Sequence, residues 1–213
     1  MVHAPLLAGH GRDVATLAST RWTDWLGSAR EALTACAAAG PVPVVASSAG
    51  GLLALHLAVT RPQDVRALVL LATPMSLRPM VAAQIRLRLL VPAAIRPQSW
   101  NVIPKARGPD VSDPILAAGL RSLRAYPLAT LGQLLDLMAD VRPRLPQVTQ
   151  PVLLVHGDLD STVSRAQVEA LAHALDHAAR VERLDLPASA HLVAIDRDQA
   201  ALQARIATFL DSL

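Results

Sequence analysis

Apolar positions along the chain follow two alternating patterns, one typical of buried strands and the other of helices. Short apolar runs bounded by proline, glycine or charged residues predict strands at Val42–Ala46, at Val65–Ala72, after Pro151 and at Val181–Leu186. Apolar residues at three- and four-residue steps predict helices over 20–40, 49–60, 128–141, 164–178 and the C-terminal segment. Because strands alternate with helices through short connections, we predict an α/β fold: one domain over residues 1–213 with a doubly wound, mostly parallel sheet.

The alternation of strands and helices stops between residues 75 and 126. An apolar repeat every four residues predicts one helix in this segment, with Leu77, Val81, Ile85 and Leu89 on one face. Three prolines then interrupt the chain, and Ser112-Asp113-Pro114 is typical of the start of another helix. We therefore expect residues 75–126 to form a helical cap or lid inserted over the sheet.

Composition narrows the class of protein. The chain is 52% hydrophobic but only 2% aromatic, so the core must be built from aliphatic side chains. The net charge of +3 and the lack of a basic run with interleaved aromatics argue against a nucleic-acid partner. No stretch of about 18 apolar residues is free of charge and proline, so a soluble cytoplasmic protein is expected. The single cysteine, Cys36, excludes an intramolecular disulfide, and its place on an apolar helix face predicts a buried, inert thiol.

The predicted lid carries an unbalanced charge. Between residues 78 and 107 it has six basic residues and no acidic one: Arg78, Arg86, Arg88, Arg96, Lys105 and Arg107. A solvated face is the favoured interpretation. The alternative is a weak contact with an anionic lipid surface, with the apolar side of the lid lining a substrate pocket.

The stretch Val42–Gly51 predicts a strand, a tight turn and a helix, with a serine at the corner. Such a turn exposes a nucleophilic hydroxyl, and the next amide lies at a helix N-terminus, where negative charge is stabilised. The turn tolerates only small side chains two residues either side of the nucleophile, which favours Ser48, flanked by Ala46 and Gly50, over Ser47. The amide of Ala49 is then a candidate oxyanion donor.

Asp158 or Asp160, and His191, also follow predicted strands, in the chain order serine, aspartate, histidine. An imidazole that reaches the serine hydroxyl can remove its proton, and a carboxylate can orient that imidazole. This pattern predicts attack on an acyl carbon without a cofactor or metal. His173 and His177 stand four residues apart, as metal ligands can, but surface histidines are favoured because no further ligand is suggested nearby.

Five motifs, in order and spacing, resemble the carboxylesterase and monoacylglycerol-lipase branch of the α/β-hydrolase superfamily. They are Pro5-Leu6-Leu7-Ala8-Gly9-His10-Gly11, Trp22-x-x-Trp25-Leu26, Ala46-x-Ser48-x-Gly50-Gly51, His156-Gly157-x-x-Asp160 and Ser189-x-His191. The resemblance implies a Ser48–Asp160–His191 triad, with Asp158 left as a turn former. It also implies a serine ester hydrolase that acts on apolar acyl esters through an acyl-enzyme, and an apolar lid over residues 75–126 suggests medium-length acyl or monoacylglycerol-like esters.

The resemblance also exposes a gap at the N-terminus. In the family, three strands and a helix precede the Gly-His-Gly turn and include the loop that supplies a second oxyanion amide. Treating Gly9–Gly11 as that loop would leave too few residues before Ser48. Missing strands would expose sheet edges, through which the chain could form an oligomer. The gap therefore makes a catalytically silent, truncated hydrolase-fold protein that acts as a binding or partner-dependent module the alternative to an ester hydrolase. Among enzymes, a peptidase or acyltransferase with the same triad is a further alternative, because the triad fixes the acyl intermediate and not the group that receives it.

Overall fold

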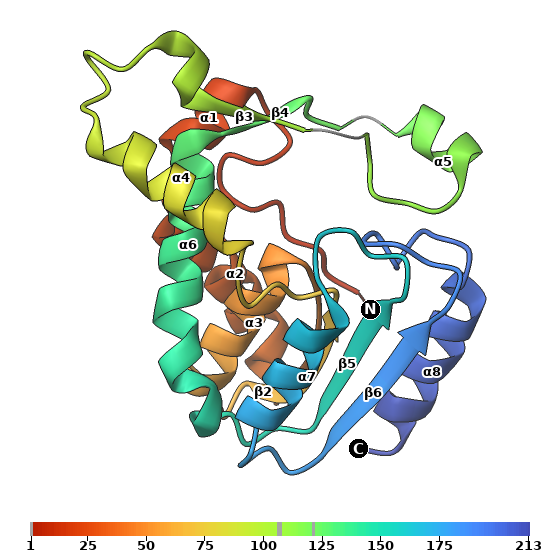
Figure 1. Cartoon of the computed structure of the whole chain (residues 1–213). Coiled ribbons are helices and arrows are strands. Elements are labelled where there is room, and N and C mark those ends of the chain that lie inside the picture. The colour runs from red at the N-terminus through yellow and green to blue at the C-terminus, as the bar shows by residue number, and fades with distance from the viewer. Residues whose placement is uncertain (1, 106–107, 121) are drawn as a thin grey trace.

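A computed structural model of the chain describes residues 2–105, 108–120 and 122–213, and its centre is a parallel sheet (Figure 1). The sheet has the order β1–β2–β5–β6, and its strands are β1 (Val42–Ser47), β2 (Val65–Leu71), β5 (Val152–Gly157) and β6 (Val181–Leu186). All three pairings are parallel. The predicted doubly wound α/β architecture is confirmed, and the carboxyl ends of all four strands meet at one edge.

Helices cover both faces of this sheet. Alternate residues of β2 point to opposite sides, so Leu68 and Leu70 pack with the larger helical layer while Ala67 and Val69 pack with the other. The larger layer contains α2 (Trp22–Cys36), α3 (Ala49–Thr60), α6 (Leu128–Val141) and α7 (Arg165–Ala174). The opposite face packs against α8 (Gln199–Asp211), which contributes Leu202 and Phe209. The remaining short elements of this body are α1 (Val14–Ser19), η1 (Ala37–Ala39) and η3 (Arg142–Gln147).

The predicted boundaries agree with the structure for three elements, whereas two predicted helices extend too far, including the one predicted over 164–178, where α7 ends at Ala174. The helices at 49–60 and 128–141 and the strand at 181–186 have the predicted limits. The first long helix ends earlier than predicted: α2 stops at Cys36, and a 3₁₀ turn leads to Gly40, whose φ of 136° favours glycine. Trp25, on α2, is buried in the core, with 3% of its surface exposed.

The described residues of the 75–126 segment leave the sheet and lie, together with α1, in the upper lobe of Figure 1, beyond the carboxyl ends of the strands. The elements there are α4 (Pro79–Leu90), η2 (Gln98–Asn101), β3 (Val102–Pro104), α5 (Pro114–Gly119) and β4 (Ala125–Pro127), with β3 and β4 paired antiparallel. The Asp113 side chain caps α5, as its sequence predicts. Arg107, one of the six basic residues noted above, lies outside the described residues.

Both edge strands, β1 and β6, have a single strand partner among the described residues, and the β1 edge is open to solvent. β1 pairs with β2 alone, and Val45 in its centre is 49% exposed. A groove of about 290 Å³ runs beside this strand, lined by residues of β1, α2, α3 and the N-terminal segment. Cys36 lies on this groove and is exposed, so the prediction of a buried thiol is wrong. The reason is that no described element covers the end of α2 at this edge.

Among the described helices, none combines the length and apolar character needed to cross a bilayer.

Candidate active site

Ser48 is the single residue between β1 and α3, and its backbone is strained. Its φ of 52° and ψ of −125° lie in a region that residues other than glycine rarely adopt. The Ser48 amide donates to the carbonyl oxygen of Leu71 at 2.8 Å, which ties the turn to the carboxyl end of β2. A turn of this kind holds the serine hydroxyl above the sheet edge. Ser47, the alternative nucleophile, is instead the last residue of β1.

Small residues make this turn possible, although the tightest contact is not the one expected from the sequence. A Cβ atom on Gly50 would lie 3.9 Å from the Cβ of Ala46, an ordinary contact. A Cβ atom on Gly51 would overlap the side chain of Thr73, at the end of β2. The close approach between α3 and the sheet therefore requires glycine at position 51.

His191 lies in the loop after β6 and contacts the other two predicted residues. Its Nε2 is 2.9 Å from the Ser48 Oγ, and its Nδ1 is 2.9 Å from the Asp160 Oδ2. Because a carboxylate only accepts hydrogen bonds, the Nδ1 proton is donated to Asp160, which leaves Nε2 to accept from the serine hydroxyl. The structure thus brings together three residues that are 143 and 31 positions apart.

Asp160 is held by hydrogen bonds in the loop after β5. Its side chain is fully buried, and its Oδ1 accepts from the amides of Thr162 and Val163 at 2.7 and 2.8 Å. Burial alone would raise the pKa of this carboxyl, but the hydrogen bond and charge of His191 and the two amides together lower the pKa below its usual value. The group is therefore a carboxylate at neutral pH.

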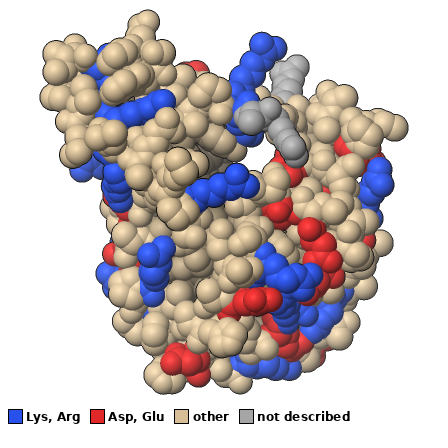
Figure 2. Space-filling model, in the orientation of Figure 1, with Lys and Arg blue, Asp and Glu red and all other residues tan. Residues whose placement is uncertain are grey.

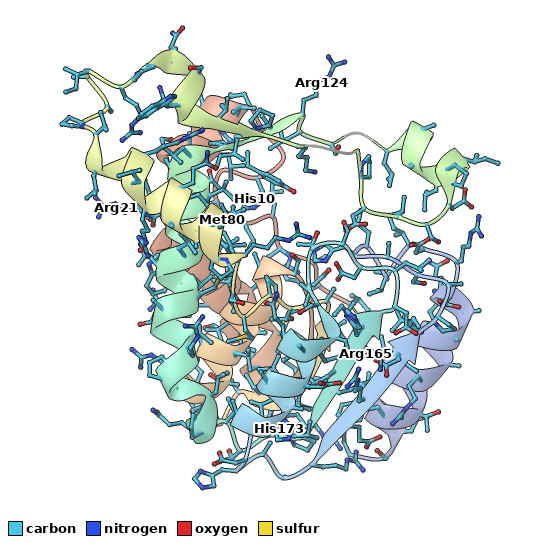
Figure 3. The ribbon with its side chains drawn as sticks, in the orientation of Figure 1. His10, Arg21, Met80, Arg124, Arg165 and His173 are labelled. Carbon is cyan, nitrogen blue, oxygen red and sulfur yellow. The ribbon has the colours of Figure 1, made fainter. Side chains whose placement is uncertain are left out.

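Asp158, the other aspartate of this loop, does not share this geometry. Its Oδ1 is 2.6 Å from a guanidinium nitrogen of Arg165, which also contacts Asp185. Arg165 starts α7, and Figure 3 shows it among the side chains in front of the sheet. Asp158 therefore belongs to a partly exposed ion-pair cluster.

Two further aspartates, which no sequence motif marks, hold the loop that carries His191. Asp196 is 4% exposed and accepts from the amide of Ala190 at 2.8 Å. Asp198 accepts from the hydroxyl of Ser189, also at 2.8 Å. Both follow His191 within seven residues, but nothing in that spacing distinguishes them from ordinary helix-start residues.

The 75–126 segment is hydrogen-bonded to the two loops that carry Asp160 and His191. Ser112 donates its amide and its hydroxyl to Asp196, at 2.8 and 2.7 Å. Asp110 accepts from the hydroxyls of Ser161 and Thr162, the two residues after Asp160, at 2.8 and 3.1 Å. These contacts place part of the segment beside the three-residue cluster.

The two loops also touch each other at Gly157, and this contact supports a prediction. A Cβ atom at Gly157 would overlap the carbonyl oxygens of Ser189 and Ala190. We expect Gly157→Ala to lower the free energy of unfolding by about 2–3 kcal/mol, because the backbone beside His191 must move. Urea unfolding measures this loss. Gly27→Ala is the matched control: its Cβ would meet nothing within 4 Å in the interior of α2, so this variant should be as stable as the parent or more so.

His156, on β5, gives the fold a predictable pH dependence. It is 3% exposed, and its pKa is lowered because burial disfavours the charged imidazolium, an effect that the nearby Asp160 and Asp185 only partly oppose. In the unfolded chain the His156 imidazole takes up a proton near pH 6.5, whereas in the folded chain it does so only at a lower pH. The contribution of neutral His156 to the free energy of unfolding is therefore fully present above pH 6.5 and is lost as the pH falls through the folded-state pKa. Urea unfolding between pH 7.5 and 5 should show this loss.

The matched controls for that measurement are two histidine variants. His156→Gln should flatten the dependence of unfolding free energy on pH between 7.5 and 5. His173→Gln removes an exposed histidine of α7 and should keep the slope of the parent. An equal slope in all three proteins would show that His156 does not cause the effect.

Ala49 provides the candidate oxyanion donor. It is the first residue of α3, so its amide has no partner within the helix and lies at the positive end of the helix dipole. The groove beside β1 reaches Ser47 and Gly50, but none of Ser48, Asp160 and His191 lines it. We therefore do not identify that groove with the acyl site.

The described residues contain no cluster of three or more histidine, cysteine or acidic side chains able to hold a metal ion. His173 and His177 are both exposed, as expected. Figure 3 shows His173 at the end of the molecule opposite the 75–126 segment, far from the carboxyl edge of the sheet.

Comparison with known families identifies the superfamily. Residues 2–198 match the family described as serine aminopeptidase, S33. The chain belongs to this family. It is therefore an α/β-hydrolase, as the five sequence motifs implied, and its family supports a hydrolytic activity. A search of curated proteins finds no match.

Solved structures with the same fold include several lipases. One, described with the metagenome-derived lipolytic enzymes LipS and LipT, has a TM-score of 0.82 and 21% identity to this chain. The match covers 97% of this chain and 80% of the chain in that structure. A monoacylglycerol lipase from Paleococcus ferrophilus has a TM-score of 0.73 and 14% identity, and the match covers 91% of this chain and 76% of the lipase. A monoglyceride lipase from Saccharomyces cerevisiae, bound to a substrate analogue, has a TM-score of 0.73 and 15% identity, and the match covers 96% of this chain and 74% of the lipase.

Proposed function

We propose that this α/β-hydrolase is a serine ester hydrolase in which Ser48, His191 and Asp160 form the catalytic triad. The observation that carries the proposal is the continuous hydrogen-bonded line from the Ser48 hydroxyl through the imidazole to the buried Asp160 carboxylate, with both distances at 2.9 Å. Such a line activates a hydroxyl that is otherwise a weak nucleophile.

In the proposed reaction, the Ser48 Oγ attacks the ester carbonyl carbon while Nε2 of His191 takes the hydroxyl proton. The Ala49 amide stabilises the negative oxygen of the tetrahedral intermediate. Collapse of this intermediate breaks the bond to the alcohol, which leaves with the proton from Nε2, and Ser48 remains acylated. Water then attacks the acyl-enzyme with His191 again as base, releasing the acid and restoring Ser48. Asp160 orients the imidazole and stabilises its charge in both steps.

We infer that the substrates are small esters with apolar acyl groups. The neighbouring lipases in the same fold support this class. The hydrogen bonds of Asp110 and Ser112 to the Asp160 and His191 loops further support a role for residues 75–126 as a cap beside the bound ester. In α4, however, the inward apolar side chains pack on α6, so they serve the core and do not line an acyl pocket.

The family description makes a peptidase the second candidate, because the same acyl chemistry cleaves amides. The test is hydrolysis of p-nitrophenyl esters with acyl chains of two to twelve carbons, in parallel with amino-acid p-nitroanilides. An esterase should cleave the esters and leave the anilides. Cleavage of the anilides at comparable kcat/KM would identify a peptidase instead. Cleavage of neither, together with no fluorophosphonate labelling of Ser48, would favour a catalytically silent binding module.

A further inference from the structure

Helix α4 is apolar on two opposite faces, although only one of them is buried. Its inward face packs against α6: Ile85 is fully buried, and Val81 and Leu89 lie against it. The sequence repeat predicted this face. The opposite face also carries large apolar side chains, and they are among the most exposed in the molecule: Met80 (87%), Leu87 (65%) and Leu90 (79%).

These three residues lie on one side of the helix. Met80 and Leu87 are seven positions apart, which is nearly two full turns, and Leu90 follows three positions later. We call Met80, Leu87 and Leu90 the outer face of α4. A surface helix normally presents polar residues to water on the side away from the core, so a second apolar side indicates a binding surface.

Basic residues border the outer face on both sides. Arg86 and Arg88 adjoin Leu87 in sequence and so point about 100° to either side of it around the helix. Arg86 pairs with the half-exposed Asp136 at 2.8 Å, and the Arg88 guanidinium lies 5.7 Å from the centre of the Trp100 ring. Asp136 of α6 offsets the charge of Arg86, whereas Arg88 leaves the border with a net positive charge, and the sequence between Asp64 and Asp110 adds no acidic residue.

The same lobe repeats the combination of exposed apolar, aromatic and cationic groups beyond α4. Ile95 is 74% exposed, and Lys105 lies 4.8 Å from the centre of the Tyr126 ring. Figure 3 shows Arg124 projecting away from the body of the molecule. Figure 2 shows this lobe as a protruding surface, mostly uncharged, with basic side chains and little acidic surface. Tryptophan, tyrosine and arginine beside exposed aliphatic groups are typical of surfaces that meet the headgroup region of a membrane.

We propose that the outer face of α4 docks on an anionic lipid surface, with Arg86 and Arg88 contacting the headgroups. The charge of the border complements anionic lipids, and a convex apolar face fits a flat bilayer. A helix that lies in the interface inserts its apolar side chains at the boundary of the acyl chains, and flanking arginines add electrostatic attraction. This proposal does not depend on ester hydrolysis, because binding is a property of the surface alone.

Flotation with lipid vesicles tests the apolar part of the proposal. The parent protein should float with vesicles of phosphatidylcholine and phosphatidylglycerol at a ratio of two to one, and much less with phosphatidylcholine alone. Met80→Ser/Leu87→Ser/Leu90→Ser should weaken partition into the mixed vesicles by roughly tenfold or more. The matched control is Val2→Ser/Leu6→Ser/Ile115→Ser, which removes equally exposed apolar side chains elsewhere and should bind like the parent.

Charge variants test the electrostatic part. Arg86→Gln/Arg88→Gln should weaken binding to the mixed vesicles about 25-fold at low salt, from roughly fivefold per arginine, and less at high salt. The control Arg30→Gln/Arg66→Gln has the same net charge, with its changes on α2 and β2, and should bind within about twofold of the parent.

Three results would overturn the proposal. They are failure of the parent to float with the mixed vesicles, equal flotation with both vesicle types, and parent-like flotation of the outer-face variant. Sedimentation velocity gives the alternative occupant. If the parent is a dimer, the outer-face variant is a monomer and neither binds vesicles, the outer face of α4 is the contact with a second copy of the chain. Urea unfolding of each variant shows whether the variant is folded, so that weaker flotation is not caused by loss of the fold.

Discussion

Ser48→Ala should reduce kcat for p-nitrophenyl ester hydrolysis by roughly 10⁴- to 10⁶-fold, with a small change in KM. The variant lacks the oxygen that forms the acyl-enzyme, while the Ala49 amide and the rest of the site are unchanged. The φ of 52° at this position is unfavourable for alanine and serine alike, so the turn should persist. The measurement is steady-state hydrolysis of the best ester substrate, with enzyme concentration set by absorbance and folding checked by circular dichroism.

Ser47→Ala is the matched control for this prediction. It removes the same hydroxyl one residue earlier, at the end of β1, where sequence alone left a second possible nucleophile. This variant should keep most of the parent's kcat. Loss of activity in Ser47→Ala with retention in Ser48→Ala would reverse the assignment. Labelling by a fluorophosphonate should likewise survive in Ser47→Ala and disappear in Ser48→Ala.

The grouping of Ser48, Asp160 and His191 could be predicted from sequence because it follows from the sheet. Parallel strands place their carboxyl ends at one edge, so residues just after three strands share that edge whatever their separation in the chain. The strand-to-helix turn at Ser48 is also a local feature, encoded by small residues within one short stretch. Both inferences need the order of elements and little knowledge of how loops pack.

Other features could not be predicted because they depend on which segments meet. The exposure of Cys36 depends on whether anything covers the edge of β1, and the requirement for glycine at position 51 depends on Thr73, which follows another strand, β2. The supporting role of Asp196 depends on a contact with Ser112, 84 residues away. The outer face of α4 was missed for a different reason: the four-residue repeat identifies the inner face, but the sequence does not show whether other segments cover the apolar side chains on the opposite side.

Asp160→Asn should lower kcat by about 10⁴-fold, and it tests the triad without deleting any atom of the nucleophile or base. The amide oxygen of asparagine can keep the hydrogen bonds from Thr162 and Val163, which leaves its NH₂ group facing Nδ1 of His191. Nδ1 must then accept a hydrogen bond, so the imidazole proton moves to Nε2. In that tautomer Nε2 cannot accept the proton of the Ser48 hydroxyl, although all three side chains remain in place.

Asp158→Asn provides the comparison that decides between the two aspartates of this loop. It weakens a partly exposed ion pair with Arg165, so kcat should change by no more than about threefold and the free energy of unfolding by about 1 kcal/mol or less.

The pKa of the Asp160 carboxyl is lower in the folded chain than its ordinary value of 3.8 in the unfolded chain. The ionised carboxylate therefore stabilises the fold at pH values above 3.8, and Asp160→Asn should be less stable than the parent at pH 7. Rates are therefore compared well below the unfolding temperature of both variants. A large loss of kcat in Asp158→Asn together with parent-like kcat in Asp160→Asn would transfer the orienting role to Asp158, and the buried Asp160 would then be a structural carboxylate only.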